Sequence, residues 1–343
     1  MTDFYTLTPD VVLRTLEADG FEPTGHIMTL NSYENRVYDL KLADGAHVVT
    51  KFYRPGRWTR DQIREEHAFL FEILEAEIPV CAPRRFADGD TVHEIGDILY
   101  AVWPRTGGRS KNELNDQELG ILGRLLARIH NIGAASPARH RITLDERTYA
   151  LAPLEFLREN GFLPSHLERR FSAAAERVAD LYAELARGIP VHRIHGDCHL
   201  GNLLCGTDGW FFLDFDDFLT GPAVQDLWML LMDRDAEGLR QRAVFLEAYR
   251  QFRDFDDAWF RLVEPLRALR FIHYCAWIAR RWEDPAFKAA FPHFGTAEYW
   301  ETETTDLERQ LDYILHHTAG VTPPAPPADP EPELTNKDFF WDM

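Results

Sequence analysis

The chain has 343 residues, of which 56 are acidic and 37 are basic, so its formal net charge is −19 at pH 7. This length suits one large domain or two lobes, and a hydrophobic content of 45% is ordinary for a folded globular protein. The acidic balance excludes a broad nucleic-acid or anionic-membrane surface, because both need a basic face. A local basic pocket for a phosphate group is still compatible with it.

Cysteine usage and hydropathy indicate the compartment. The four cysteines are scattered, which is typical of free thiols in a reducing environment. The opening MTDFYTLTPD lacks the basic and then apolar pattern of a signal peptide, and no run of about 18 apolar residues predicts a membrane span. We therefore expect a cytoplasmic protein with neither nucleic acid nor membrane as a partner. Without an exposed heptad pattern, a monomer is expected.

The first hundred residues favour strands with few helices. A short amphipathic helix is expected first, with Thr8 as its N-cap and Pro9 at its first position. Segments rich in β-branched and aromatic residues follow, and the turn signal Asp44-Gly45 predicts a hairpin. The expected elements are a helix at 8–19, hairpin segments at 26–42 and 46–55, an amphipathic helix at 59–77 and two short strands within 84–104.

Beyond Gly107-Gly108 the pattern becomes helical, with helical stretches expected at 115–133, 165–187 and 236–282. The predicted fold class is therefore α+β with two lobes. An antiparallel sheet with one main helix forms the N-terminal lobe, and a larger, mostly helical lobe follows. The expected boundaries are 1–104 for the first lobe, 105–320 for the second, and 321–343 for a Pro-rich acidic tail that is extended or disordered.

One stretch between the helical regions concentrates polar chemistry: HGDCHLGNLLCGTDGWFFLDFDD, from His195 to Asp217. A structural zinc site would use its cysteines and histidines, but the second ligand pair that such sites need is not nearby. An acidic turn without chemistry would not explain why polar residues cluster on both sides of the apolar run WFFL.

A phosphoryl-transfer hairpin accounts for the same stretch better. Asn202 follows Asp197 by five positions, and Asp214 follows Asn202 by twelve, after two predicted short strands. Phosphoryl transfer needs a carboxylate near the attacking hydroxyl, and an amide together with a carboxylate on Mg²⁺. The protein-kinase catalytic loop has the same offsets, with HRD replaced by HGD.

Several segments of the chain resemble those of a known protein family. The segments HGDCHLGNLL, FLDFDD and GPAVQDLW resemble the aminoglycoside phosphotransferase-like branch of the protein-kinase-like fold. The segments NSYENRVY, VTKFYRPGRWTRDQIREEH and EPLRALRFIHYCAWIARRW narrow the resemblance to the bacterial stress response kinase A family of serine/threonine protein kinases. It covers nearly the whole chain, and the Pro-rich tail lies outside it.

The resemblance implies roles for the central stretch. Asp197 would orient the acceptor hydroxyl, while Asp214 would be catalytic and, with Asn202, a ligand of Mg²⁺. Protein kinases have Asp-Phe-Gly where this chain has Asp-Phe-Asp, which disfavours a large flip of the segment and leaves Asp216 and Asp217 as candidate further ligands.

The N-terminal lobe would hold ATP. Lys51 resembles the strand lysine that binds the α- and β-phosphates, and its partner is expected to be Glu66, which could be confused with its neighbour Glu65. Ser32 lies where kinases have a glycine-rich loop and would contact the phosphates. Val102, in the hinge sequence AVWP, would meet adenine through backbone groups.

Two further features concern support and substrate. His195 is expected to pack beneath the catalytic loop, and Asp226 to tie that loop down. A later helix carries several arginines that could bind an acidic or phosphorylated substrate segment, although ion pairs within this acidic protein are the favoured interpretation. These arginines are Arg267, Arg270, Arg280 and Arg281.

The resemblance favours a serine/threonine protein kinase with ATP and a protein substrate as partners and Mg²⁺ as cofactor. A small-molecule kinase on the same fold, of aminoglycoside, choline or homoserine type, is the alternative, and the net charge of −19 suits a cationic acceptor. A pseudokinase scaffold is disfavoured, because it would not need all four of the residues Lys51, Asp197, Asn202 and Asp214.

Overall fold

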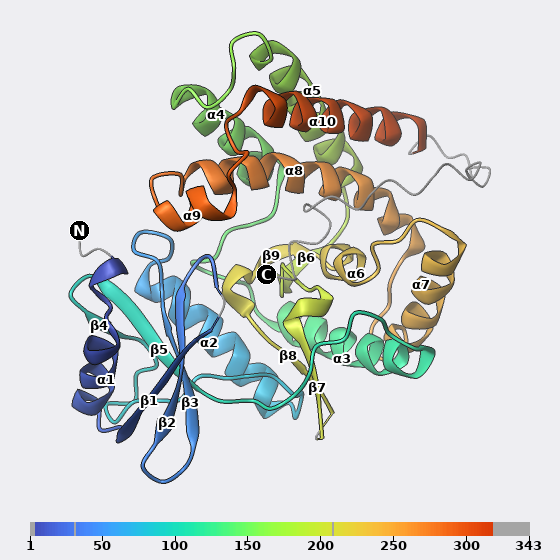
Figure 1. Cartoon of the computed structure of the whole chain (residues 1–343). Helices are drawn as coiled ribbons and strands as arrows, with labels where there is room; N and C mark the ends of the chain where they lie inside the picture. The colour runs from blue at the N-terminus through green and yellow to red at the C-terminus, as the bar shows by residue number, and fades with distance from the viewer. Residues whose placement is uncertain (1–3, 31, 208, 318–343) are drawn as a thin grey trace.

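The computed structural model describes residues 4–30, 32–207 and 209–317. Strands gather at one end of the molecule and helices at the other, so the expected α+β class is confirmed (Figure 1). The expected tail at 321–343 lies outside the described residues.

Five antiparallel strands form the N-terminal sheet in the order β1-β2-β3-β5-β4. The stretch 26–42 holds two strands rather than one, because the polar loop at 32–35 interrupts it. Its second strand pairs with the next across the expected Asp44-Gly45 turn, where Gly45 has φ 86°. The strands are β1 (Pro23–Leu30), β2 (Arg36–Leu42), β3 (His47–Phe52), β4 (His93–Ile95) and β5 (Ile98–Pro104).

Both faces of this sheet are covered. Helix α1 (Pro9–Ala18) begins as expected, with the Thr8 side chain accepting the N–H of Val11. Helix α2 (Arg60–Glu75) begins with a capping box between Thr59 and Gln62. Side chains alternate along β5 because the strand period is two, so one set packs with α1 and the other with α2.

The C-terminal part is mostly helical, with two short strand pairs, β6·β9 and β7·β8, that carry the central motif (Figure 1). None of the described helices is long and apolar enough to cross a lipid bilayer. The helices are α3 (Asp116–Ala135), α4 (Ala152–Glu159), α5 (Glu168–Leu185), α6 (Val224–Leu230), α7 (Ala236–Tyr249), α8 (Val263–Ala279), α9 (Pro285–Ala290) and α10 (Ala297–His317), and the strands are β6 (Val191–Ile194), β7 (Leu203–Gly206), β8 (Gly209–Phe212) and β9 (Leu219–Pro222).

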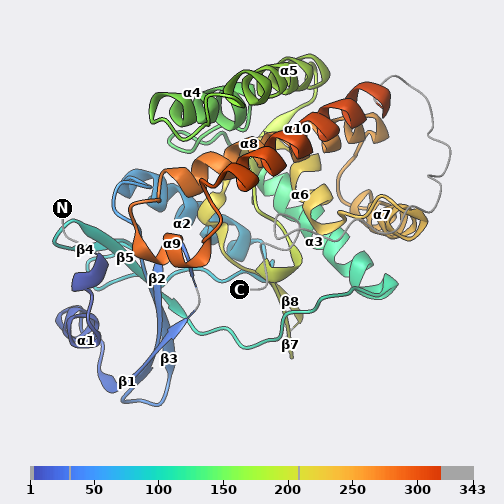
Figure 2. The same cartoon turned by 45° about the horizontal axis from the view of Figure 1, so that its top comes forward.

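The stretch 236–282 is not one continuous helix. Helix α7 ends at Tyr249, and a 3₁₀ turn begins after Asp256, whose side chain accepts the N–H of Ala258. Helix α8 then starts afresh, and Pro265 lies in its first turn, where a missing N–H is tolerated. Local capping therefore divides a helical composition into two helices with different directions (Figure 2).

Helix α9 brings the C-terminal part back to the sheet. Both views place it between α8 and the N-terminal strands (Figures 1 and 2). Its N-cap Asp284 forms an ion pair of 2.9 Å with Arg54, which follows β3. The two parts of the chain are thus joined by side chains as well as by the connection after β5.

The close approach of α3 to α7 gives a stability prediction. A Cβ atom at Gly123 would lie 2.5 Å from the carbonyl oxygen of Phe245, whereas at Gly120 the nearest atom is a flexible guanidinium nitrogen at 3.5 Å. Gly123→Ala should lower the free energy of unfolding by about 1–3 kcal/mol in urea titrations. The control Gly120→Ala should be neutral or stabilising by up to about 1 kcal/mol. Equal losses in both variants would contradict this packing.

Candidate active site

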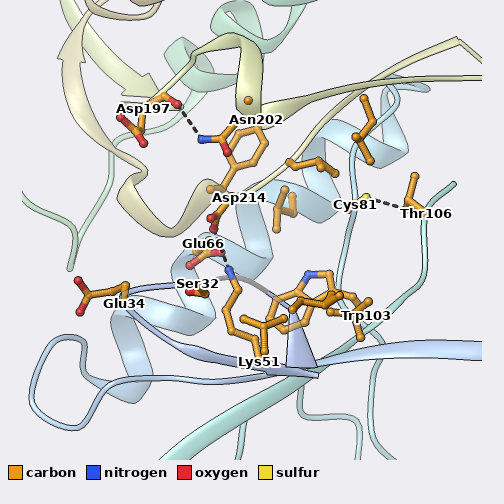
Figure 3. A pocket seen from close by; sticks show the side chains of 18 of the residues that line it. Ser32, Glu34, Lys51, Glu66, Cys81, Trp103, Thr106, Asp197, Asn202 and Asp214 are labelled. Carbon is orange, nitrogen blue, oxygen red and sulfur yellow. Dashed lines mark hydrogen bonds and ion pairs between the residues drawn. The ribbon is translucent and has the colours of Figure 1, made fainter. Parts of the chain in front are cut away.

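A cavity of about 540 Å³ lies between the sheet and the central motif (Figure 3). Its volume is in the range typical of ligand pockets. It brings together all but one of the residues that the sequence selects for the site. These are Ser32, Lys51, Glu66, Asp197, Asn202 and Asp214.

The loop that carries Asp197 is held by a buried carboxylate. Asp226, in the first turn of α6, accepts the backbone N–H groups of His195 at 2.9 Å and Gly196 at 2.8 Å. The Asp226 carboxylate is itself held by His130, whose Nε2 lies 3.0 Å from it. Burial raises the pKa of Asp226 to about 6, although the two N–H groups oppose the shift. The expected role of Asp226 in tying the loop is confirmed.

Gly196 allows the loop to turn tightly. Its φ is 85°, and a Cβ atom there would lie 2.3 Å from the carbonyl oxygen of Asp217. Beneath it, the His195 ring lies 2.7 Å from the carbonyl oxygen of Leu213, and the N–H of Asp197 donates to its other nitrogen at 3.3 Å. His195 therefore has the supporting place expected of it.

Asp197 presents an ionised carboxylate to the cavity. Burial alone would raise its pKa, but Arg270 at 3.2 Å and His199 at 3.5 Å outweigh burial and hold the pKa below the usual range. The Asn202 amide donates to the backbone carbonyl of Asp197 at 3.0 Å and fixes the loop (Figure 3). This leaves the Asn202 amide oxygen as the group available to a ligand.

Asp214 occupies a strained position at the end of the hairpin. It has φ 51° and ψ 68°, a left-handed conformation that is uncommon for a residue other than glycine. The preceding residue, Leu213, is held in place because its N–H donates to the carbonyl of Asn202 at 2.9 Å. Its half-exposed carboxylate points into the cavity (Figure 3). Such outliers are common where a side chain must be aimed at a functional site.

The expected ion pair between Lys51 and Glu66 is absent from this structure. Lys51 Nζ instead lies 2.8 Å from Asp214 and 2.9 Å from Asp216. Burial would lower the pKa of Lys51, but the charges of Asp214 and Asp216, with a smaller effect of Glu66, together raise it. Burial and the charge of Asp216 raise the pKa of Glu66 to about 8, so the folded chain favours the protonated form of Glu66 at neutral pH.

Glu66 and its neighbour Glu65 have different surroundings. Glu66 lines the cavity, and its Oε2 is buried without a hydrogen-bond partner. Glu65 instead accepts the backbone N–H groups of His140 at 2.8 Å and Arg141 at 2.9 Å. Glu66 is therefore the one that faces the site, while Glu65 fastens α2 to the C-terminal part.

Asp216 is a site residue that the sequence leaves only as a candidate ligand. It is buried, and it receives hydrogen bonds from Lys51 and from the Asn35 amide at 2.5 Å. Burial opposes ionisation, but Lys51 and Arg57 lower the pKa of Asp216 to about 2. Asp216 thus serves as the charge partner within the protein, and the doubled acid of FDD was its only sequence signal.

The loop over the cavity is held from both sides. Ser32 Oγ accepts the N–H of Asn35 at 3.1 Å, which shapes the turn. The buried Glu34 lies 2.7 Å from Arg281 and accepts the indole N–H of Trp277 at 2.9 Å, both from the α8 region. The sequence did not indicate these contacts, because nothing local relates residue 34 to a helix some 240 residues later.

Val102 does not line the cavity. Its side chain packs in the α1 core beside Phe52, and its carbonyl already accepts the N–H of Arg84 at 2.6 Å. The residues at the cavity wall are the next ones along the chain, Trp103, Pro104, Arg105 and Thr106. The expected hinge AVWP thus meets the cavity through Trp103 and Pro104, and an apolar run such as ILYAVW does not show which of its residues face which side.

The fold and the cavity define a phosphotransferase. Residues 26–263, more than half of the chain, match the model of the phosphotransferase enzyme family. Among solved structures, an amicoumacin kinase shares 21% identity at a TM-score of 0.69, covering 89% of this chain and 93% of that one. A microcompartment-associated aminopropanol kinase shares 17% at 0.65, covering 90% and 97%. At these identities the likeness shows the fold.

The curated relatives show which group of phosphotransferases the chain belongs to. Stress response kinase A from Escherichia coli K12 is 40% identical over 321 residues, which is 93% of this chain and 97% of that protein. The serine/threonine protein kinase RdoA from Salmonella typhimurium is 39% identical over the same shares. The chain therefore belongs to the stress response kinase A family, and the expected resemblance is confirmed.

The raised pKa of Glu66 predicts how stability depends on pH. Between the ordinary value of 4.5 and about 8, the folded chain holds a proton that the unfolded chain has lost. This contribution to stability is therefore complete at low pH and is lost as the pH rises through about 8. Relative to Glu66→Gln, the wild type should lose on the order of 2 kcal/mol between pH 6 and 8.

Urea unfolding at several pH values would measure this difference. The control is Glu75→Gln, an exposed position at the end of the same helix, whose curve should run parallel to that of the wild type. If the wild type and Glu66→Gln keep a constant difference across the range, Glu66 does not carry the proton.

Proposed function

We propose that this protein transfers the γ-phosphoryl group of ATP to serine or threonine hydroxyls of protein substrates. The observation that carries the proposal is that Lys51, Asp197, Asn202 and Asp214 line one cavity. These are the cation, carboxylates and amide that phosphoryl transfer requires. The protein acceptor is supported by the relative named as a serine/threonine protein kinase.

In this proposal Asp197 orients the acceptor hydroxyl. Its carboxylate is ionised and can accept a hydrogen bond from that hydroxyl. Because the transition state of phosphoryl transfer is largely dissociative, the main contribution of such a residue is positioning. The hydrogen bonds that Asp226 and Asn202 make to the loop support that position.

Asn202 and Asp214 are the residues that would hold Mg²⁺. An amide oxygen and a half-exposed carboxylate are hard oxygen donors, and Mg²⁺ commonly uses one or two such protein ligands together with phosphate oxygens and water. When bound, the ion neutralises phosphate charge. Lys51 would bind the α- and β-phosphates, with Asp216 keeping its charge partnered within the protein.

The remaining walls fit the rest of the nucleotide. Backbone groups near Trp103 and Thr106 would meet the adenine, in place of Val102. The Ser32 turn would cover the phosphates, since Ser32, Tyr33 and Glu34 line the cavity. The lobe boundary at 104/105, the cytoplasmic location and the monomeric state remain predictions from the sequence.

A cationic small-molecule acceptor, the alternative from the sequence, fits this cavity less well. Arg270 lies 3.2 Å from Asp197, and Arg57 lies 2.6 Å from the neighbouring Asp217. The carboxylates on the acceptor side therefore already have cationic partners. Net charge over the whole chain does not report the charge of this site.

The central test is an assay with Mg²⁺ and γ-labelled ATP on a generic protein substrate. Asp197→Ala should fold and bind ATP, but transfer should fall by about 10²–10⁴-fold because the hydroxyl is no longer oriented. The control is Asp254→Ala, which removes an exposed carboxylate and should keep the rate. An unchanged rate in Asp197→Ala would remove this residue from the mechanism.

Asp214→Asn tests the metal ligand. The variant keeps the shape of the side chain but loses its charge, so half-maximal activity should require at least about tenfold more Mg²⁺. Rates measured across a Mg²⁺ titration at saturating ATP would show this shift. A variant with the wild-type metal response would assign the ligand to another residue.

A further inference from the structure

A second cavity adjoins the acceptor side of the site. The space next to Asp197 is lined by Arg270, Tyr149 and His273. It continues into a cavity of about 320 Å³ that shares Tyr149 and His273 with it. The residues that define this second cavity, called here the arginine pocket, are Arg54, Arg57, Arg280, Arg281 and His273.

The imidazole of His273 lies among several guanidinium groups. Its ring stacks on Tyr149 at 4.3 Å, and its Nδ1 is buried without a hydrogen-bond partner. Burial, followed by the charges of Arg280 and Arg270, lowers its pKa to about 3, so the ring is neutral at pH 7. Arg281 and Arg57 act in the same direction. A buried polar atom without a partner is costly unless a ligand supplies one.

The carboxylates around the pocket are as many as its four arginines, but they are unevenly distributed among them. Glu34 lies 3.2 Å from Arg54, 3.7 Å from Arg57 and 2.7 Å from Arg281, so one charge is shared by three cations. The other carboxylates are Asp217 beside Arg57, Asp216, which also pairs with Lys51, and Asp284 beside Arg54. These carboxylates therefore compensate Arg54, Arg57 and Arg281, and none of them lies beside Arg280.

Arg280 is the cation in this pocket that the protein leaves for a ligand. Within the described part of the chain its side chain forms no ion pair and no hydrogen bond, and its guanidinium lies over the ring of Phe156 at 5.0 Å. Burial lowers its pKa, and no carboxylate counters that shift. The side chain is also exposed, so a ligand can reach it.

We infer that the arginine pocket is an acceptor subsite for an anionic side chain, so that preferred acceptors are serines or threonines within acidic segments. A carboxylate or a phosphate monoester would pair with the guanidinium of Arg280 and give Nδ1 of His273 a hydrogen-bond partner. The inference rests on the proposed function and specifies its substrate class.

The geometry favours an extended segment over a single small anion. The stacked rings of Tyr149 and His273 line both cavities, whereas Asp197 lines only the first cavity and Arg280 only the second. The anionic group therefore belongs to a side chain other than the one that accepts the phosphoryl group. An acidic residue near the acceptor in a peptide meets that condition.

Synthetic peptides would test the subsite. Each carries one acceptor serine flanked by glutamate, by alanine or by phosphoserine blocked from further transfer, and kcat/KM is measured for each. The wild type should prefer the glutamate peptide to the alanine peptide by at least about fivefold. Arg280→Glu should abolish that preference while leaving the alanine peptide unchanged, and Arg280→Lys should restore part of it. The glutamate and phosphoserine arms separate the two sources of anionic charge.

The matched control is Arg309→Glu, which makes the same charge reversal at an exposed position on α10 and should keep the preference. Equal use of glutamate and alanine peptides by the wild type, or the same profile in Arg280→Glu and Arg309→Glu, would overturn the inference.

A binding measurement separates this inference from the proposed function. Calorimetry with the glutamate peptide in which alanine replaces the acceptor serine needs no phosphoryl transfer. Binding that weakens at least about fivefold in Arg280→Glu supports the subsite, even if no peptide is phosphorylated. Transfer to no protein or peptide by the wild type would contradict the proposed function, whereas transfer without any dependence on Arg280 would contradict the subsite alone.

Discussion

The site depends on one buried charge cluster, in which Lys51 of the sheet meets Asp214 and Asp216 of the central motif. An ammonium group removed from water is costly unless carboxylates compensate it, so strand β3 is stable in this place only when the motif lies against it. Glu65 and Glu34 add two further ties between the parts of the chain. The same interaction thus joins the sheet to the helices and places a cation at the cavity.

Behind this cluster lies a second constraint, the buried carboxylate of Asp226. By accepting two successive backbone N–H groups it holds a turn that only glycine fits at position 196. The left-handed conformation of Asp214 is maintained by the hairpin on one side and by the short helix that follows on the other. Rigid support of this kind lets a few side chains hold their directions without a ligand to organise them.

Spacing within the motif was enough to predict Asp197, Asn202 and Asp214, because a short hairpin fixes their relative places. The supporting place of Asp226 was expected from the resemblance to the family, and that of His195 from its position beside the loop. The partner of Lys51 could not be predicted, since it depends on the protonation of Glu66, and that is set by burial among residues distant in sequence. The facing of the Val102 side chain could not be predicted, because a uniformly apolar strand does not reveal which side chains point to which face. The break within 236–282 could not be predicted either, because capping by Asp256 outweighs helical composition.

The most direct test is a crystal structure of the protein with Mg²⁺ and a non-hydrolysable ATP analogue. We expect the phosphates at Lys51 and the metal at Asp214 and Asn202, with Asp216 still beside the lysine. A nucleotide bound outside this cavity, or a metal held without Asp214, would contradict the proposed site.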